Sequence, residues 1–109
     1  NKLNKKYMYS VLEKVGLEPR SKIPVGKYSL GMRQRLAIGQ AIMENPDILI
    51  LDEPMNGLDK NGVQEMRGLF EQMKNEGKLI ILASHNREDI DVLCDEVYEM
   101  ENGILKKRR

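Results

Sequence analysis

Four polar residues follow the ends of two apolar runs, and their chemical types suit catalysis. The run 48–51 is followed by Asp52 and Glu53, and a second run, 79–83, is followed by a serine and His85. Because adjacent residues of an extended chain point apart, we expect the two carboxylates to have different roles. Paired acids beside a histidine suit metal-assisted hydrolysis or general acid–base catalysis.

The two apolar runs lack the alternation of apolar and polar residues that marks a half-exposed strand. Continuous runs of this length are typical of strands that are buried on both faces of a parallel sheet. Pro54 follows the two acids and cannot continue a strand ladder. Because ligands of open α/β sheets gather beyond the carboxyl ends of the strands, we expect Asp52 and Glu53 to face one pocket together with Ser84 and His85.

Helices must hold these strands in place. The spacing of apolar residues predicts helices over residues 1–18, about 29–44, roughly 60–75 and about 87–94. The apolar stripe predicted for the second helix consists of Met32, Leu36, Gly39 and Met43. One side of the third helix is predicted to carry Val63, Met66, Leu69, Phe70 and Met73.

Glycine and small polar residues mark the boundaries of these elements. Gly16 suits the end of the first helix, Ser29 opens the second and Gly77 follows the third. An Asn-Gly pair within 97–105 supplies the positive φ angles of a tight hairpin turn. The order of elements therefore predicts an α/β fold in one domain, with a mostly parallel sheet flanked by helices and a C-terminal β-hairpin.

Composition limits the classes of function. Eighteen basic and seventeen acidic residues give a net charge of +1, which offers no electrostatic reason to bind nucleic acid or a membrane surface. The lone Cys94 cannot form an internal disulfide and fits a reducing compartment. No apolar run approaches the ~20 residues that span a bilayer. We expect a soluble, cytoplasmic chain, and its start without methionine indicates a piece of a longer protein.

Four segments together resemble the C-terminal half of an ABC ATPase. In order, YSLGMRQRLA at 28–37, ILILDEP at 48–54, NGLD at 56–59 and SH at 84–85 are similar to the ABC signature, the Walker B strand, the D-loop and the H-loop. The resemblance runs from about residue 24 to 106. The form of the signature is most similar to bacterial ATPases that energise efflux or immunity transporters for peptide antibiotics. The resemblance implies a P-loop NTPase-like fold.

The resemblance implies roles for the residues at the strand ends. Asp52 binds Mg²⁺, mostly through water, because Mg²⁺ keeps several waters and takes few protein carboxylates. Glu53 polarises the attacking water, which phosphoryl transfer requires. His85 contacts the γ-phosphate and links it to Glu53.

The signature and the D-loop imply a site shared between two subunits. The resemblance implies that Ser29 and Gly31 would meet the γ-phosphate of ATP bound to the opposite subunit. The chemistry is compatible with this, since a helix N-terminus presents free N–H groups and glycine allows close approach. The simpler interpretation of Ser29 is a helix N-cap. Asp59 lies at the dimer interface, or caps the third helix, or does both. Leu30 and Met32 depart from the family pattern, which usually has glycine and glutamine there, whereas Gln34 and Arg35 fit it.

The phosphate-binding loop of the family, which is glycine-rich and ends in Lys followed by Ser or Thr, does not occur in these 109 residues. We therefore expect residues 1–109 to be the C-terminal part of an ABC nucleotide-binding domain. Within it, 1–28 ends the helical subdomain and 29–109 carries the motifs. Alone, the chain should bind ATP weakly and hydrolyse none. The resemblance implies that the strand carrying this loop lies between the strand before His85 and the one at Val97. We therefore expect an interrupted sheet that closes up differently or dimerises through strand edges.

The leading hypothesis is the ATP-binding and hydrolysing subunit of an ABC transporter, with ATP and Mg²⁺ as ligands. Its partners would be a second ATPase subunit in a head-to-tail dimer and a transmembrane permease, with no nucleic acid. It would be cytoplasmic and peripheral on the inner face of the membrane. Two alternatives remain: a soluble ABC ATPase that acts on the ribosome or DNA, and a non-catalytic interaction module.

Overall fold

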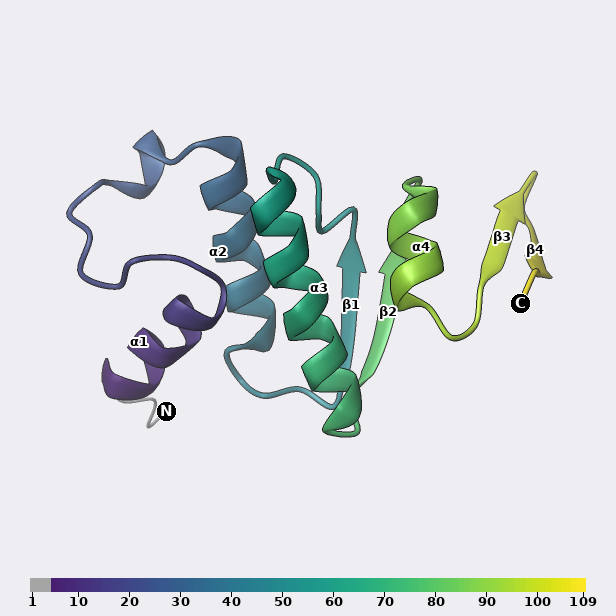
Figure 1. The fold of residues 1–109 in the computed structure, drawn as a ribbon, viewed down its shortest axis with the longest axis horizontal. Coiled ribbons are helices and arrows are strands. Elements are labelled where there is room, and N and C mark those ends of the chain that lie inside the picture. Colours follow the sequence, from purple (N-terminus) through teal and green to yellow (C-terminus); the bar gives the residue numbers. More distant parts are fainter. Residues whose placement is uncertain (1–4) are drawn as a thin grey trace.

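The computed structural model describes residues 5–109, in which helices pack against a small parallel sheet and a separate hairpin follows (Figure 1). The helices are α1 (Lys5–Lys14), α2 (Leu30–Ile42), α3 (Lys60–Asn75) and α4 (Arg87–Leu93), with a short 3-10 turn, η1 (Val25–Lys27), before α2. The strands are β1 (Ile48–Asp52), β2 (Leu79–Ala83), β3 (Tyr98–Glu101) and β4 (Ile104–Lys107). The described residues include no helix long and apolar enough to cross a membrane.

The predicted helices form, and their ends follow from local chemistry. Three of them begin after an N-cap whose side-chain oxygen accepts the backbone N–H three residues later, and these caps are Ser29, Asp59 and Asn86. The first predicted helix, 1–18, includes residues 1–4, which lie outside the described part, and it ends earlier than predicted, at Lys14. Gly16 takes a φ of 83° just beyond that end, a conformation that glycine adopts readily.

The core lies between α1, α2, α3 and β1. Its largest fully buried side chains are Ile38, Met66 and Val15. The stripe predicted for α3 is confirmed, since four of its five residues are buried and Val63 packs against the cluster. The stripe predicted for α2 is incomplete. The buried residues of α2 are Ile38, Gly39 and Ile42, because this helix packs against both α1 and β1 and its buried face is wider than one line of residues.

The parallel pairing of β1 with β2 is confirmed, with Asp52 opposite Ala83 at the carboxyl end. The prediction that both faces of these strands are buried is wrong. Leu49 is 2% exposed, whereas Ile50 is 72% exposed and Ile81 is 48% exposed. The reason is that α2 and α3 contact the strands on the face of Leu49, and nothing else in residues 5–109 covers the opposite face.

The C-terminal hairpin is also confirmed. β3 pairs with β4 in antiparallel register around Asn102 and Gly103, which have φ angles of 53° and 77°. It does not pair with β1 or β2, so the described residues form two separate two-stranded sheets, in line with the interrupted sheet expected above. Figure 1 shows the hairpin at the far side of α4 from β2. Arg109 ties the chain end to α4 by donating to the carbonyl oxygens of Ile90, at 3.2 Å, and Cys94, at 2.6 Å.

Candidate functional site

The site begins at Glu53, which is the residue directly after β1 and has a φ of 46°. A residue with a side chain adopts this left-handed conformation only when its surroundings hold it there. Three hydrogen bonds do so. The Glu53 N–H donates to the Ala83 carbonyl at 2.8 Å, and its own carbonyl accepts from the Gln34 side-chain amide at 2.8 Å and from the Asn56 N–H at 3.1 Å. The turn directs the Glu53 side chain toward the end of the neighbouring strand.

Glu53 and His85 meet there, as the two strand ends predicted. The Oε2 atom of Glu53 accepts from the backbone N–H of His85 at 3.0 Å and lies 2.7 Å from its Nδ1 atom. Because a carboxylate oxygen only accepts, this contact requires the proton on Nδ1. The second ring nitrogen, Nε2, is then directed away from Glu53, and the His85 side chain is 99% exposed. The pair therefore presents one carboxylate and one free ring nitrogen to a ligand.

This contact shifts the pKa of both groups. The hydrogen bond to His85 lowers the pKa of Glu53, because it favours the ionised carboxylate. The hydrogen bond and charge of Glu53, with a smaller effect of Asp52, raise the pKa of His85. His85 is exposed and Glu53 is partly exposed, so water screens the interaction. Near neutral pH, Glu53 is thus an ionised acceptor, the state that a water-orienting carboxylate needs.

Asp52 ends β1 beside this pair and has an exposed carboxylate without a hydrogen-bond or ion-pair partner among residues 5–109. The same residues contain no cluster of three or more His, Cys, Asp or Glu side chains that could hold a metal ion. Mg²⁺ commonly binds through one or two carboxylates, several waters and substrate phosphates. The donor set therefore fits a water-rich Mg²⁺ held by Asp52 together with phosphates, and does not fit an all-protein metal cage.

The first turn of α2 packs against the turn that follows β1. The Ser29 hydroxyl accepts the Met32 N–H at 3.1 Å, so its predicted role as an N-cap is confirmed. Gly31 is needed for close packing, because a Cβ there would lie 3.0 Å from the Gly57 carbonyl oxygen. Leu30, which departs from the family pattern, lies over Gly57, where a Cβ would be 2.6 Å from its side chain. The leucine therefore fills the space above this turn.

Asp59 caps α3. Its Oδ1 atom accepts the Gly62 N–H at 2.8 Å, which confirms the capping interpretation. The structure does not bring Asp59 into the Glu53–His85 pair. Its role between two subunits stays a prediction.

Arg35, to which the sequence assigned no contact, joins α2 to α3 and to the turn after α1. Its Nη1 atom donates to the Val15 carbonyl at 3.1 Å and to the Glu65 carboxylate at 2.7 Å. Its guanidinium lies so close to Gly16 and Gly62 that a Cβ at either position would collide with it. No local pattern reveals this contact, because the partners lie on different elements.

A buried ion pair, also missed from the sequence, fixes the segment after His85. The carboxylate of Asp89 on α4, in a residue only 3% exposed, lies 2.7 Å from Nη2 and 3.2 Å from Nε of Arg67 on α3. Two donors from one guanidinium make a geometrically defined contact. Since α4 begins two residues after His85, this pair restrains the chain that carries the imidazole.

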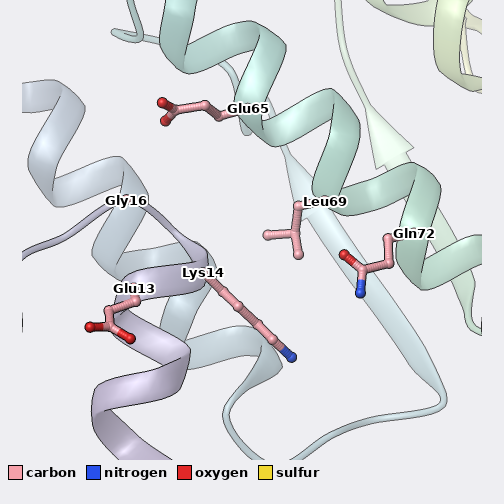
Figure 2. Close-up of a pocket in the computed structure, with 6 residues that line it drawn as sticks. All are labelled: Glu13, Lys14, Gly16, Glu65, Leu69 and Gln72. Atoms are coloured by element: carbon pink, nitrogen blue, oxygen red, sulfur yellow. The ribbon is translucent and has the colours of Figure 1, made fainter.

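A surface hollow of about 390 Å³ lies elsewhere, between the end of α1 and one side of α3 (Figure 2). Figure 2 shows Glu13 and Lys14 on α1 and Glu65, Leu69 and Gln72 on α3. None of the residues predicted to act on a ligand lines it. The candidate chemistry is therefore at the strand ends and not in this hollow.

Comparisons with known proteins agree with the motifs. The sequence model of the ABC transporter family matches residues 2–56. The chain is 50% identical over 95 residues to the uncharacterized ABC transporter ATP-binding protein YybJ of Bacillus subtilis, covering 87% of this chain and 44% of that protein. It is 47% identical over 99 residues to the lantibiotic transport ATP-binding protein SrtF of Streptococcus pyogenes, covering 89% and 43%. It is 47% identical over 96 residues to the bacitracin transport ATP-binding protein BcrA of Bacillus licheniformis, covering 87% and 31%. The chain thus spans less than half the length of these relatives.

Proposed function

The chain belongs to the ABC transporter family, and from this premise we propose that it supplies the water-positioning part of an ATP-hydrolysing subunit that energises a membrane transporter. The observation that carries the proposal is the contact of 2.7 Å between Glu53 and the Nδ1 atom of His85. A transporter is favoured over action on the ribosome or DNA because the relatives are named as transport ATP-binding proteins.

In the proposed mechanism, the ionised Glu53 carboxylate accepts a hydrogen bond from the attacking water and orients it toward the γ-phosphate. His85 holds this carboxylate through Nδ1 and the backbone N–H, and in the doubly protonated ring, which its raised pKa favours, Nε2 also carries a proton that it can donate to a phosphate oxygen. Asp52 would hold Mg²⁺, which neutralises charge on the phosphates when it is bound.

The γ-phosphate would also need donors from a second subunit. We propose that the N-terminus of α2, with the backbone of Ser29 and Gly31, provides them to ATP on the opposite subunit. Asp59, in the turn that α2 packs against, would lie at that subunit interface. ATP binding further requires a phosphate cradle that residues 1–109 do not contain, so these residues alone should release no phosphate from ATP.

A transmembrane permease would be the third partner, and it would hold the subunit at the inner face of the membrane. The names of two relatives support a peptide antibiotic such as a lantibiotic or bacitracin as the transported compound. Transport by membrane vesicles that contain the whole protein and its permease, with and without ATP, tests this part.

The experiment for the catalytic proposal measures ATP-dependent phosphate release by the whole protein and by its Glu53→Gln variant. The amide keeps the size of the side chain and removes the acceptor charge, so the rate should fall by about 10²-fold or more. Glu101→Gln is the matched control, because Glu101 is an exposed acid on the hairpin. Equal rates for wild type and Glu53→Gln would remove the catalytic role and favour a non-catalytic interaction module.

A further inference from the structure

The backbone of Glu53 is held partly from within its own turn and partly by other elements. Its φ of 46° is a sparsely populated conformation for a residue with a side chain. The N–H is held by β2, through Ala83. The carbonyl is held locally by the Asn56 N–H at 3.1 Å and from outside the turn by Gln34.

Gln34 reaches this carbonyl from a different element. It lies on α2, 19 residues earlier in the chain, and its Nε2 atom donates to the Glu53 oxygen at 2.8 Å in a partly buried contact. The next residue, Arg35, anchors the same turn of α2 to α3 and to Val15, just after α1. The glutamine amide is therefore presented from a helix that is fixed on two sides.

We propose that Gln34 is a positioning residue that holds the peptide of Glu53 in the orientation that brings its carboxylate to His85. The contact between Gln34 and Glu53 does not depend on the proposed function. Only its expected effect on catalysis rests on that function. The carbonyl that Gln34 holds and the carboxylate that His85 binds belong to the same residue, so a change in the backbone angles of Glu53 that breaks the first contact is expected to displace the water-orienting group. A displacement of about 1 Å in a catalytic group is enough to lower a rate by about 10²-fold.

The first test measures backbone amide hydrogen exchange in the chain by NMR. Gln34→Met keeps the length and helix propensity of the side chain but removes the donor, and Gln34→Glu keeps its shape but only accepts near neutral pH. We expect the amides of His85 and Asn56 to exchange about 3- to 10-fold faster in both variants, as for the loss of one hydrogen bond. Amides of α3 should be unchanged.

Gln40→Met is the matched control, because Gln40 is exposed on the same helix. It should leave the exchange of His85 and Asn56 at the wild-type rate. Faster exchange spread over α2 in the Gln34 variants would indicate a merely structural role and would overturn the proposal. Unchanged exchange at His85 in either Gln34 variant would also overturn it.

The second test measures kinetics in the whole protein. If Gln34 positions Glu53, Gln34→Met should lower kcat by about 10- to 100-fold and leave KM for ATP within about twofold, since only the water-orienting group moves. If the amides exchange faster while kcat stays unchanged, the claim that Gln34 affects catalysis is wrong. Because the exchange test does not depend on ATP, it distinguishes failure of this positioning contact from failure of the proposed ATPase function.

Discussion

Two ion pairs with the same contact distance have opposite surroundings. The Arg67–Asp89 and Glu53–His85 contacts are both 2.7 Å long. The Asp89 side chain is 4% exposed and the His85 side chain is 99% exposed. The buried pair joins two helices and excludes ligands, whereas the exposed pair orients groups that remain open to a ligand. Burial, and not contact distance, therefore distinguishes the pair that stabilises the fold from the pair that is available for chemistry.

The strongest test of this contrast is Asp89→Asn. It leaves the guanidinium of Arg67 without its buried counter-charge, so the free energy of unfolding should fall by about 3–5 kcal/mol. Denaturant unfolding followed by circular dichroism measures the change. Asp91→Asn is the control, because Asp91 is an exposed acid on the same helix and contacts Arg109 at 3.5 Å. A loss of equal size in both variants would show that burial of Asp89 does not set the effect.

A third ion pair, between Arg35 and Glu65, is intermediate in burial. Arg35 and Glu65 also lie 2.7 Å apart, but Glu65 is 56% exposed while Arg35 is 16% exposed. Because water screens the pair and Arg35 keeps its bond to the Val15 carbonyl, Glu65→Gln should lower the free energy of unfolding by only about 0.5 kcal/mol. The same denaturant experiment checks it. A loss as large as that of Asp89→Asn would contradict the ordering by burial.

Loss of the exposed Glu53–His85 contact should change the pKa of His85 more than it changes the free energy of unfolding. In Glu53→Gln, the pKa of His85 should fall toward its ordinary value of 6.5, because the carboxylate that raises it is gone. The raised pKa means that the contribution of His85 to stability is complete below pH 6.5 and disappears as the pH rises through its folded pKa. The contribution of Glu53 is complete above pH 4.5 and disappears as the pH falls through its lowered pKa.

NMR titration of the His85 ring in the wild-type chain and in Glu53→Gln measures this effect. Unfolding free energies measured from about pH 9 down to well below pH 4.5, so that both windows are covered, provide the second observable. An unchanged pKa of His85 in the variant would mean that the two side chains do not interact in solution.

The parts of the structure that depend on local chemistry were predictable from the sequence. Gly16 and Gly77 mark helix ends by taking φ angles of 83° and 91°, and Asn102-Gly103 forms the hairpin turn. The meeting of Glu53 with His85 followed from the alignment of two parallel strands, which places their carboxyl ends side by side. The membership in the ABC transporter family was also predictable, because four motifs occur in order, and the comparisons confirm it.

The missed features depend on contacts between distant elements. Arg67 and Asp89 are 22 residues apart, and Gln34 and Glu53 are 19 apart, so no helical or strand periodicity relates them. The exposed face of β1 was missed for a related reason. An apolar run of residues indicates that a strand can be buried on both faces, but which face is covered depends on the other elements that are present.

That uncovered face has a practical consequence for handling the chain. Its large apolar residues are Ile48, Ile50, Leu79 and Ile81, each at least 48% exposed. A contiguous apolar surface of this kind binds hydrophobic dyes such as ANS, which are commonly used to detect loosely packed states. The folded chain should therefore fluoresce with such a dye before it melts, and dye binding would misreport a well-packed protein as partly unfolded.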